Sequence, residues 1–550
     1  MQCPVCLQQQ TNTLLLDPCG HSLCRGCLHT WCKTQDDDHK EPTCPVCRAT
    51  IEDAHDGNDP PPISTIDAFL EKSMARYNTW CESETGPRKE PHQVEGLEWC
   101  LRREHAIQAQ RHSPFRRQKV CKGGLICDEM GLGKTIQVLG LIISNFLERT
   151  LIVLPPALVD QWIHAFETFC GHTPLLYHGP KRHLVSKDDL ESAPIVITTY
   201  HTLAAEHRVK KKVPDFQPPI ATLSWSRLVM DEAHHLRNRN SLFDAARMID
   251  VDLVWLVTGT PVHNREMDLD AYWYILGLPK DLIRTLYTSG RSTLRRLFRE
   301  AVLRRTKAEV GIELPALTEE VINVNCDDHY EQDFAEQLHS QLGFSGLVRD
   351  RVSGASTFLT RNVLPALVRC RQACVRPELM DPHIQAYREM VGDHEIPNAP
   401  KTSAKLDAVV DRMVERRDMG RKIAFCHYLG EIDSLSDRLL QRGFTVGYID
   451  GRVPRTVRTQ YIMDPHGPDV LLVQINSGSE GLNMQAYSDL YVVSPHWYPA
   501  VDDQAIARAH RIGQSNPVHV SRFLSSHQHT LSLDHHAHNI QLLKRRIRPF

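Results

Sequence analysis

Between Gln93 and about Gln514 the chain alternates short apolar runs with longer stretches of helical periodicity. Five runs stand out in the first half of this region: Gly124–Cys127, Leu151–Leu154, Ile195–Thr198, Leu228–Met230 and Leu253–Val257. Strands of this kind that alternate with helices indicate parallel, doubly wound α/β sheets. The pattern therefore predicts an α/β core that occupies most of the chain.

Length and composition limit the remaining possibilities. At ~150 residues per domain, 550 residues predict roughly three to four units. The chain has no run of 18 apolar residues and no basic segment followed by an apolar one at its start, so neither a membrane span nor a secretory signal is expected. The net charge of −3 means that a nucleic-acid surface would have to be a local basic groove.

The first apolar run leads directly into the sequence DEMGLGKT and then into a helical pattern. In such an arrangement of strand, loop and helix, backbone amides and the helix N-terminus cradle phosphate, Lys134 reaches the β- and γ-oxygens, and Thr135 holds Mg(II). The usual first glycine of the pattern is replaced by Asp128, while Gly131 and Gly133 still permit close backbone approach. The predicted nucleotide-binding residues of this loop are Asp128, Glu129, Met130, Gly131, Leu132, Gly133, Lys134 and Thr135.

About a hundred residues later, another apolar run ends in the sequence DEAH. A carboxylate at the C-terminal end of a strand faces the phosphate loop, so Asp231 is predicted to hold Mg(II) through water. Glu232 is predicted to orient and deprotonate the attacking water. A surface acidic helix start is the alternative reading of this motif taken alone.

A third cluster lies near the end of the chain. Gln504, Arg508 and Arg511 recur at helical steps and would share one face of a helix. Two guanidinium groups aimed at a γ-phosphate would act as arginine fingers, although solvated arginines on an amphipathic helix have the same pattern.

Cysteines are concentrated at the N-terminus, where eight of the seventeen lie in the first 47 residues. This distribution favours a reducing compartment and a metal module. Pairs with two-residue spacers can share one tetrahedral Zn(II), so eight ligands predict two structural zinc sites, while Cys32 falls outside the spacing. The predicted ligands are Cys3, Cys6, Cys19, His21, Cys24, Cys27, Cys44 and Cys47.

The phosphate loop, the DEAH sequence and the C-terminal arginine cluster together resemble the Swi/Snf-type DNA-dependent ATPases of helicase superfamily two. The resemblance covers about 450 residues and runs through DEMGLGKT, LIVLPPALVDQW, IVITTY, DEAHHLRN, TGTPVHN, LRRTK, RQACVRPEL, AFCHY, YIDG and SGSEGLNMQAY in order. It implies two RecA-like lobes with ATP in the cleft, Gln93 as the residue that reads adenine, and arginine fingers from lobe two. Further matches in lobe two are Asp450, Gly451, Arg458, Gly478, Gly481 and Asn483.

The order of the cysteine pairs, with Cys-x-His as the second, resembles a RING finger. That resemblance implies cross-braced pairing, with Cys3, Cys6, Cys24 and Cys27 on one zinc ion and the other four ligands on the second. It also implies a contact with a ubiquitin-conjugating enzyme through Val5, Trp31, Pro45 and Arg48. A zinc module used only for docking is the alternative.

The expected order of domains is the finger (1–50), a linker with a short helix (51–90), lobe one (91–315), a helical insertion (316–400) and lobe two (401–550). The helix in the linker follows from apolar residues that repeat at steps of three and four, namely Ile63, Ile66, Phe69, Leu70, Met74 and Tyr77. Packing against the core is the preferred role of this helix, and partner binding is the alternative. In relatives of the helicase-like transcription factor type, the finger usually interrupts the stretch before lobe two, whereas here it precedes lobe one.

By resemblance, the lobes would grip the backbone of double-stranded DNA, with little sequence specificity. The predicted contacts are Thr198, Thr199, Arg237, Asn238 and Trp497. Histidines 527, 529, 535, 536 and 538 have no tight ligand spacing with cysteine, so a polar surface is expected there, with adventitious metal as the alternative.

The combined pattern predicts a nuclear ATP-driven translocase on duplex DNA that carries a ubiquitin ligase finger and acts in repair, chromatin or transcription. Nucleosomes and DNA-bound proteins are further candidate partners. One alternative is a strand-separating helicase. Another is a ubiquitin ligase or adaptor whose two lobes serve mainly as a DNA-binding scaffold. Short viral relatives called global transactivators are similarly compact.

Overall fold

The computed structural model describes residues 13–17, 22–24, 27–28, 43–44, 51, 53–56, 66–112, 121–262, 266–288, 291–341, 363–391, 398–464, 466–475, 483–528 and 531–546. The chain forms two compact units. The first comprises Met1–Pro261 and Met267–Thr306, and the second comprises Val262–Glu266 and Lys307–Phe550. Within the described ranges, no helix is both long and apolar enough to cross a membrane.

The first unit is built on a sheet of seven parallel strands. All five strands expected from the apolar runs are present in it, so the predicted parallel α/β fold is confirmed. In spatial order the strands are β10 (Val302–Leu303), β4 (Gly123–Ile126), β9 (Asp250–Val257), β8 (Ser224–Asp231), β5 (Thr150–Leu154), β7 (Ile195–Thr199) and β6 (Leu175–Tyr177).

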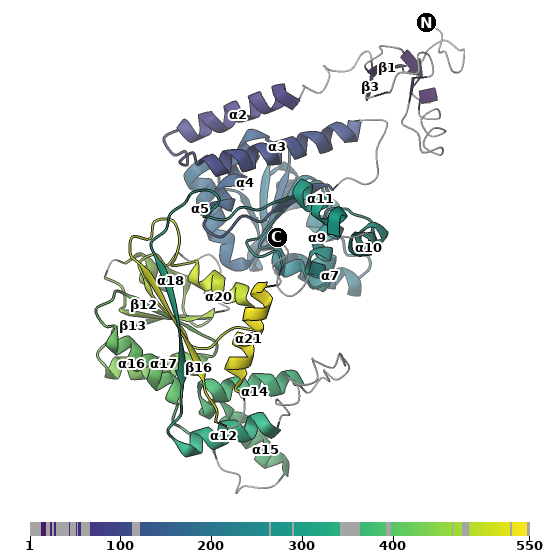
Figure 1. Ribbon diagram of the computed structural model, residues 1–550. Helices are drawn as coiled ribbons and strands as arrows, with labels where there is room; N and C mark the ends of the chain where they lie inside the picture. Colours follow the sequence, from purple (N-terminus) through teal and green to yellow (C-terminus); the bar gives the residue numbers. More distant parts are fainter. Residues whose placement is uncertain are drawn as a thin grey trace. The chain divides into compact units, whose positions relative to one another are not determined.

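In the described part of this unit, ten helices surround or extend the sheet, and Figure 1 labels most of them. They are α2 (Ile66–Glu82), α3 (Pro91–His112), α4 (Lys134–Ser144), α5 (Val159–Cys170), α6 (Lys187–Ser192), α7 (Tyr200–Lys212), α8 (Ser241–Ala246), α9 (Asp270–Ile275), α10 (Lys280–Thr288) and α11 (Arg291–Ala301). Helices α2 to α5 share one apolar core with the central strands. Helix α2 buries Leu70, Tyr77 and Trp80, and the Trp80 indole donates a hydrogen bond to the Phe169 carbonyl at 2.5 Å. This is the packing role expected for that helix.

A fully buried ion pair links the helices to the sheet. Arg227 of β8 donates two hydrogen bonds to the Glu104 carboxylate of α3, at 2.7 and 2.6 Å, and both side chains are 0% exposed. The indole of Trp255 and the amide of Asn145 also donate to Glu104, and Arg227 donates to the Asn145 carbonyl. These partners replace the water that both charges lose on burial.

The second unit has a sheet of six parallel strands. Their order is β11 (Leu317–Val324), β16 (Val518–Ser525), β15 (Asp489–Val492), β12 (Lys422–Cys426), β14 (Val470–Gln474) and β13 (Val446–Ile449). Alternate residues of β12 enter two separate cores, Ala424 and Cys426 on one face and Ile423 and Phe425 on the other. Both faces of the sheet are therefore covered, as expected for a doubly wound sheet.

Among the residues described for this unit, eight helices accompany the sheet. They are α12 (His329–Gln341), α14 (Val363–Val375), α15 (Asp381–Val391), α16 (Ala404–Glu415), α17 (Leu429–Gln441), α18 (Arg455–Met463), α20 (Pro499–Ile506) and α21 (Leu533–Arg546). The sequence places a helical insertion from residue 316 onwards, but the structure has strand β11 at its start, in register with β16. Helices begin only at His329.

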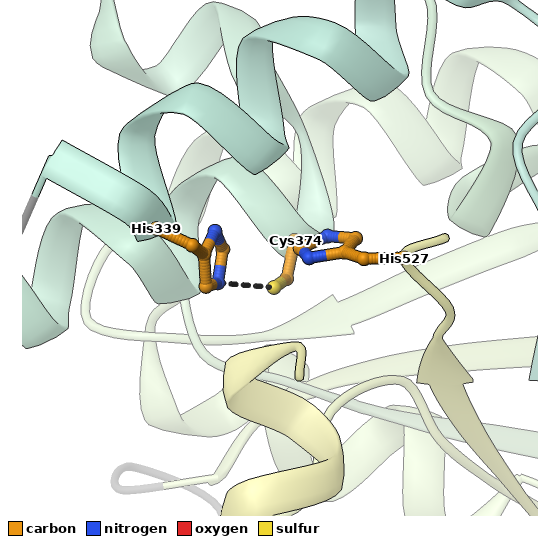
Figure 2. A group of neighbouring side chains, drawn as sticks. All are labelled: His339, Cys374 and His527. Atoms are coloured by element: carbon orange, nitrogen blue, oxygen red, sulfur yellow. Dashed lines mark hydrogen bonds between the residues drawn. The ribbon is translucent and has the colours of Figure 1, made fainter. Parts of the chain in front are cut away.

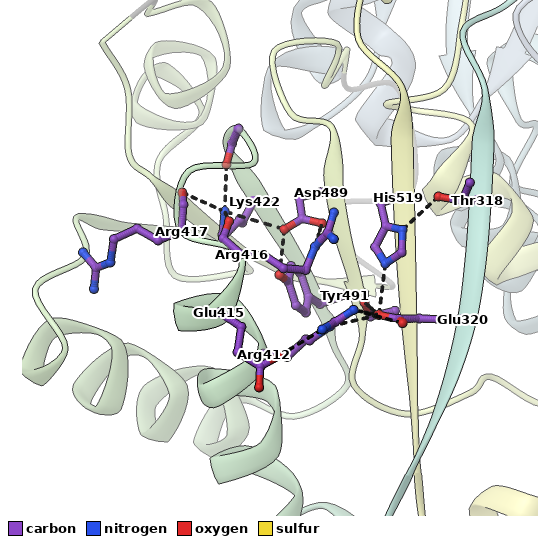
Figure 3. A network of polar contacts seen from close by, with 12 residues as sticks. Thr318, Glu320, Arg412, Glu415, Arg416, Arg417, Lys422, Asp489, Tyr491 and His519 are labelled. Atoms are coloured by element: carbon purple, nitrogen blue, oxygen red, sulfur yellow. Dashed lines mark hydrogen bonds and ion pairs between the residues drawn. The ribbon is translucent and has the colours of Figure 1, made fainter.

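A polar network fixes β11 at the edge of the sheet (Figure 3). The Glu320 carboxylate accepts hydrogen bonds from His519 at 3.0 Å, from Ser521 at 2.7 Å and from Arg412 at 2.8 Å. Such cross-strand partners let a polar strand join the sheet without a wide apolar face. This explains why an apolar-run criterion does not find β11.

The N-terminal finger contributes a small antiparallel sheet of three strands, in the order β2 (Ser22–Cys24), β1 (Thr13–Asp17) and β3 (Asp53–Asp56). A small apolar cluster joins Leu16, Leu23, Leu28, Cys44 and Ile51. The described residues of the finger thus supply only a small apolar core, and zinc is expected to contribute the remaining folding energy.

Candidate nucleotide-binding site

The phosphate loop connects β4 to α4 in the first unit. Gly133 lies at the helix N-cap with φ of 76°, and Gly131 has φ of 92°, both in the left-handed region that favours glycine. A Cβ on Gly133 would lie only 2.3 Å from the Gln93 side-chain nitrogen. The positive φ therefore favours glycine at position 133, and a larger residue there would also displace the end of the Gln93 side chain.

Lys134 is the first residue of α4, and Thr135 is the second. The Lys134 ammonium donates to the Asp128 carbonyl at 2.8 Å and to the Glu129 carbonyl at 3.3 Å, so the side chain folds back over the start of the loop. Burial lowers the pKa of Lys134, and the nearby charges of Glu232 and Asp231 oppose that shift. The lysine and the two carboxylates therefore act on one another electrostatically.

Asp128, which replaces the usual glycine, is a buried brace. Its carboxylate accepts two hydrogen bonds from the Arg305 guanidinium, one of them at 3.2 Å, and its side chain is 0% exposed. Arg305 follows β10 and also donates to the backbone carbonyl of His92. The pair therefore joins the loop to the start of α3.

Gln93 and His92 contact the middle of the loop. The Gln93 amide and the His92 ring both hydrogen-bond the Leu132 carbonyl, at 3.3 and 3.0 Å. The side-chain oxygen of Gln93 is buried and has no hydrogen-bond partner in the described part of the chain. An unsatisfied acceptor fits the exocyclic amino group of adenine, as the predicted role of Gln93 requires.

Asp231 ends strand β8 and is held from several sides. The Trp162 indole donates to its carboxylate at 2.8 Å, the backbone amide of Glu232 donates at 2.9 Å, and the Tyr200 hydroxyl donates to its carbonyl at 2.7 Å. Burial and the adjacent Glu232 charge raise the pKa of Asp231 to about 6. Binding a cation would relieve both effects, so the electrostatics fit a magnesium ligand.

Glu232 has a strained backbone, with φ of 48°, and it is the one non-glycine residue with positive φ among those described. Its carboxylate lies 3.1 Å from the His234 ring. Strain of this kind is maintained only where the surrounding structure enforces it, and it concentrates at functional sites.

Two contacts of this site were not predicted from the sequence. Arg305 and Trp162 both lie inside motifs quoted above, LRRTK and LIVLPPALVDQW, but neither was predicted to contact the nucleotide site; as part of a basic pair, Arg305 was expected on a solvated face or beside DNA. Arg305 stands 177 residues from its partner Asp128, and Trp162 stands 69 from Asp231. The motifs include both positions, but the spacing of motifs along the sequence does not show that Arg305 contacts Asp128 or that Trp162 contacts Asp231.

The second unit carries the predicted arginines. Helix α20 contains the buried Gln504 but ends at Ile506, so Arg508 and Arg511 lie in the turns that follow and not on one continuous helix. Burial and the neighbouring Arg508 charge lower the pKa of Arg511. The Arg511 Nε is buried without a hydrogen-bond partner in the described ranges. Two close cations with an unsatisfied donor fit a phosphate anion.

Of the further matches in this unit, Arg458 donates to the Asp450 carbonyl at 2.6 Å and so closes the turn that contains Gly451. Asn483 is exposed and donates to Gln485. Gly478 and Gly481 lie outside the described residues.

The predicted DNA contacts differ in exposure. Thr198 and Thr199 are buried, with the Thr198 hydroxyl donating to the Tyr177 carbonyl and Thr199 capping α7. Arg237 is half-buried and Asn238 is exposed. Trp497 packs against a small core of α14 and α21. Contact of these residues with DNA stays a prediction.

In the finger, Cys24 and Cys27 are half-buried and Cys44 is buried. The other predicted zinc ligands (Cys3, Cys6, Cys19, His21 and Cys47) lie outside the described residues, as do the predicted enzyme contacts Val5, Trp31, Pro45 and Arg48.

Three relatives illustrate the similarity of most of the chain to known proteins. A probable global transactivator of Orgyia pseudotsugata multicapsid polyhedrosis virus is 27% identical, over 80% of this chain and 87% of the relative. Chromodomain-helicase-DNA-binding protein 6 of Rattus norvegicus is 24% identical over 84% of this chain, and the ISWI chromatin-remodeling complex ATPase CHR11 of Arabidopsis thaliana is 26% identical over 78%. The matched regions span only 18% and 40% of these two longer proteins.

Family models divide the chain into three matched regions. A RING-type zinc finger of the C3HC4 type matches residues 1–54, and the helicase conserved C-terminal domain matches residues 404–513. The SNF2-related domain matches residues 92–379, which is more than half of the 550 residues. The phosphate loop, the DEAH carboxylates and Gln93 all fall within this last match, and the chain belongs to the SNF2-related family.

Proposed function

We propose that the protein is an ATP-driven translocase on double-stranded DNA. The chain carries SNF2-family ATPase domains of the remodeller type together with a RING finger. The observation that carries the proposal is that Lys134, at the start of α4, lies close enough to Asp231 and Glu232, at the end of β8, for both carboxylate charges to oppose the lowering of its pKa. A buried cation beside two carboxylates at the end of a phosphate loop suits nucleotide hydrolysis.

Within this proposal each residue has one task. Lys134 leaves the carbonyls of Asp128 and Glu129 and binds phosphate oxygens, while the amides from Gly131 to Thr135 surround them. Asp231 and Thr135 hold magnesium, which when bound supplies positive charge to the phosphates. Glu232 orients the attacking water and accepts its proton.

Arg508 and Arg511 of the second unit would complete the reaction as arginine fingers. Hydrolysis would then require the two units to approach, and release of products would let them separate. With both units bound to DNA, alternation of these states produces steps along the duplex. The contacts would be made to phosphates, and Arg237 and Asn238 are the accessible candidates in the first unit.

The test compares ATP turnover by the full chain with duplex DNA, single-stranded DNA and RNA. Stimulation should be strongest with duplex DNA, and Lys134→Ala should abolish it. Stimulation by RNA alone would overturn the proposal. A strand-displacement assay separates translocation from the alternative of unwinding, since a translocase moves along the duplex and releases no single strand.

A second activity is favoured by the finger. We infer that it binds two Zn(II) ions and serves as a ubiquitin ligase module, which the match to residues 1–54 supports. Ubiquitin chains should form with a conjugating enzyme and be lost in Val5→Ala and Arg48→Ala. If Lys134→Ala abolishes ATP turnover and leaves chain formation intact, the two activities are separable. The identity of the relatives as chromatin factors favours nuclear action on DNA-bound proteins or nucleosomes.

A further inference from the structure

Three potential metal ligands from distant parts of the second unit meet at one point (Figure 2). His339 comes from α12, Cys374 comes from α14, and His527 lies two residues after β16. One ligand atom from each residue lies within 4.8 Å of the other two. Within the described ranges, this is the one group of three or more such residues that are close enough to hold an ion. We propose that these residues form a zinc site separate from the finger.

The distance between the first two ligands suits zinc. Cys374 Sγ lies 3.5 Å from His339 Nε2. Bonds of about 2.3 Å from zinc to sulfur and about 2.0 Å from zinc to nitrogen, at a tetrahedral angle, separate the two ligand atoms by about 3.5 Å. An ion could therefore be accommodated without a change in this separation.

The orientation of the His339 ring is fixed by its other nitrogen. His339 Nδ1 lies 2.6 Å from the Ala335 carbonyl, which can only accept, so Nδ1 carries the hydrogen. The lone pair then belongs to Nε2 and faces Cys374. Histidine ligands of metals commonly donate their second nitrogen to a carbonyl in this way. The Leu533 amide donates to Nε2 at 3.3 Å, a long hydrogen bond that a metal–nitrogen bond replaces.

His527 distinguishes a metal site from an ordinary hydrogen bond between a thiol and an imidazole. Its ring stands edge-on to that of His339, with the ring centroids 4.5 Å apart. The sequence predicted a polar surface for this histidine, but the fold places it half-buried beside Cys374. Two imidazoles and a thiolate suit the borderline-soft Zn²⁺, and the partial exposure of His527 leaves a side on which water can be the fourth ligand.

The surroundings favour a structural role. His339 and Cys374 are 1% and 5% exposed, and Cys374 belongs to an apolar cluster with Cys370 and Leu533. An ion bound here would fasten α12 and α14 to the segment between β16 and α21. Since the site is only formed in the folded unit, zinc binding would add to the stability of that unit.

The test measures zinc in the full chain by mass spectrometry, in the wild type and in Cys374→Ala, His527→Ala and Cys370→Ala. Cys370 is the matched control because it is a buried cysteine one turn earlier on the same helix and outside the group of ligands. The wild type and Cys370→Ala should hold about one zinc ion per chain more than the other two variants. Zinc in the finger is common to all four and cancels in the comparison.

A second measurement covers the case in which Cys374→Ala fails to fold. The half-buried His527 tolerates substitution more readily, so the increase in melting temperature on adding zinc to chelator-treated protein is compared between wild type and His527→Ala. A larger increase for the wild type supports the site. Equal zinc contents in all folded variants, together with equal thermal shifts, would overturn the proposal.

Discussion

At the scale of single residues, the brace between Asp128 and Arg305 explains why the phosphate loop departs from the common glycine pattern. Asp128→Gly restores that pattern but leaves the largely buried Arg305 without its carboxylate. Removing one partner of a buried ion pair costs about 3–5 kcal/mol. We expect lower stability and weaker ATP binding, by about tenfold or more. Calorimetry and nucleotide titration check this, with Asp128→Asn as the milder control; unchanged or tighter binding by Asp128→Gly would contradict it.

Glu320 predicts a specific dependence of stability on pH. Partial burial would raise its pKa, but hydrogen bonds from His519, Ser521 and Arg412 outweigh this and lower the pKa to about 2, from an ordinary value of 4.5. Charged Glu320 therefore stabilises the fold fully above about pH 4.5, and this contribution is lost as the pH falls towards 2. Melting temperatures measured between pH 6 and 3 should fall less steeply for Glu320→Gln. The exposed Glu313→Gln should retain the wild-type slope, and a common slope for all three proteins would refute the assignment.

At the scale of elements, the ion pair of Glu104 and Arg227 holds α3 against β8. Arg227→Met leaves the Glu104 charge buried and should lower the free energy of unfolding by about 3–5 kcal/mol. The double variant with Glu104→Gln should recover part of the loss, because no uncompensated charge remains. Urea unfolding of both variants measures this. The explanation fails if the double variant is less stable than Arg227→Met.

The elements also show how far the sequence predicts the structure. Apolar runs identified five parallel strands because burial on both faces requires continuous apolar residues. Strand β11 was not identified, since Glu319, Glu320 and Asn323 break any such run and the strand depends on partners from β16, α16 and α21. The loop, Lys134 and Asp231 could be predicted from local motifs. The hydrogen bonds from Arg305 and Trp162 could not be predicted, because these residues are far from their partners along the chain and only the complete fold brings them together.

At the scale of the whole molecule, the proposed cycle assigns catalysis to both units. Arg511→Ala should leave ATP binding by the first unit nearly unchanged, because Lys134, Gln93 and Asp128 all belong to that unit. Loss of an arginine finger lowers kcat by about 10³–10⁵. Turnover with duplex DNA and nucleotide binding, measured side by side, test this split. The exposed Arg442→Ala is the control, and weakened ATP binding without a fall in kcat would contradict the assignment.

The pairing of β11 with β16 has a consequence for synthesis on the ribosome. Thr318 and His519, which face each other across these strands, are 201 residues apart. The described strands and helices of the first unit have all been synthesised by Leu303. Strand β11 follows, but the residues of its partner β16 are synthesised only 201 residues later. During that interval its open edge can pair with other chains. The glutamates that make β11 hard to recognise as a strand also carry charge, which would oppose aggregation of the nascent chain until β16 has been synthesised.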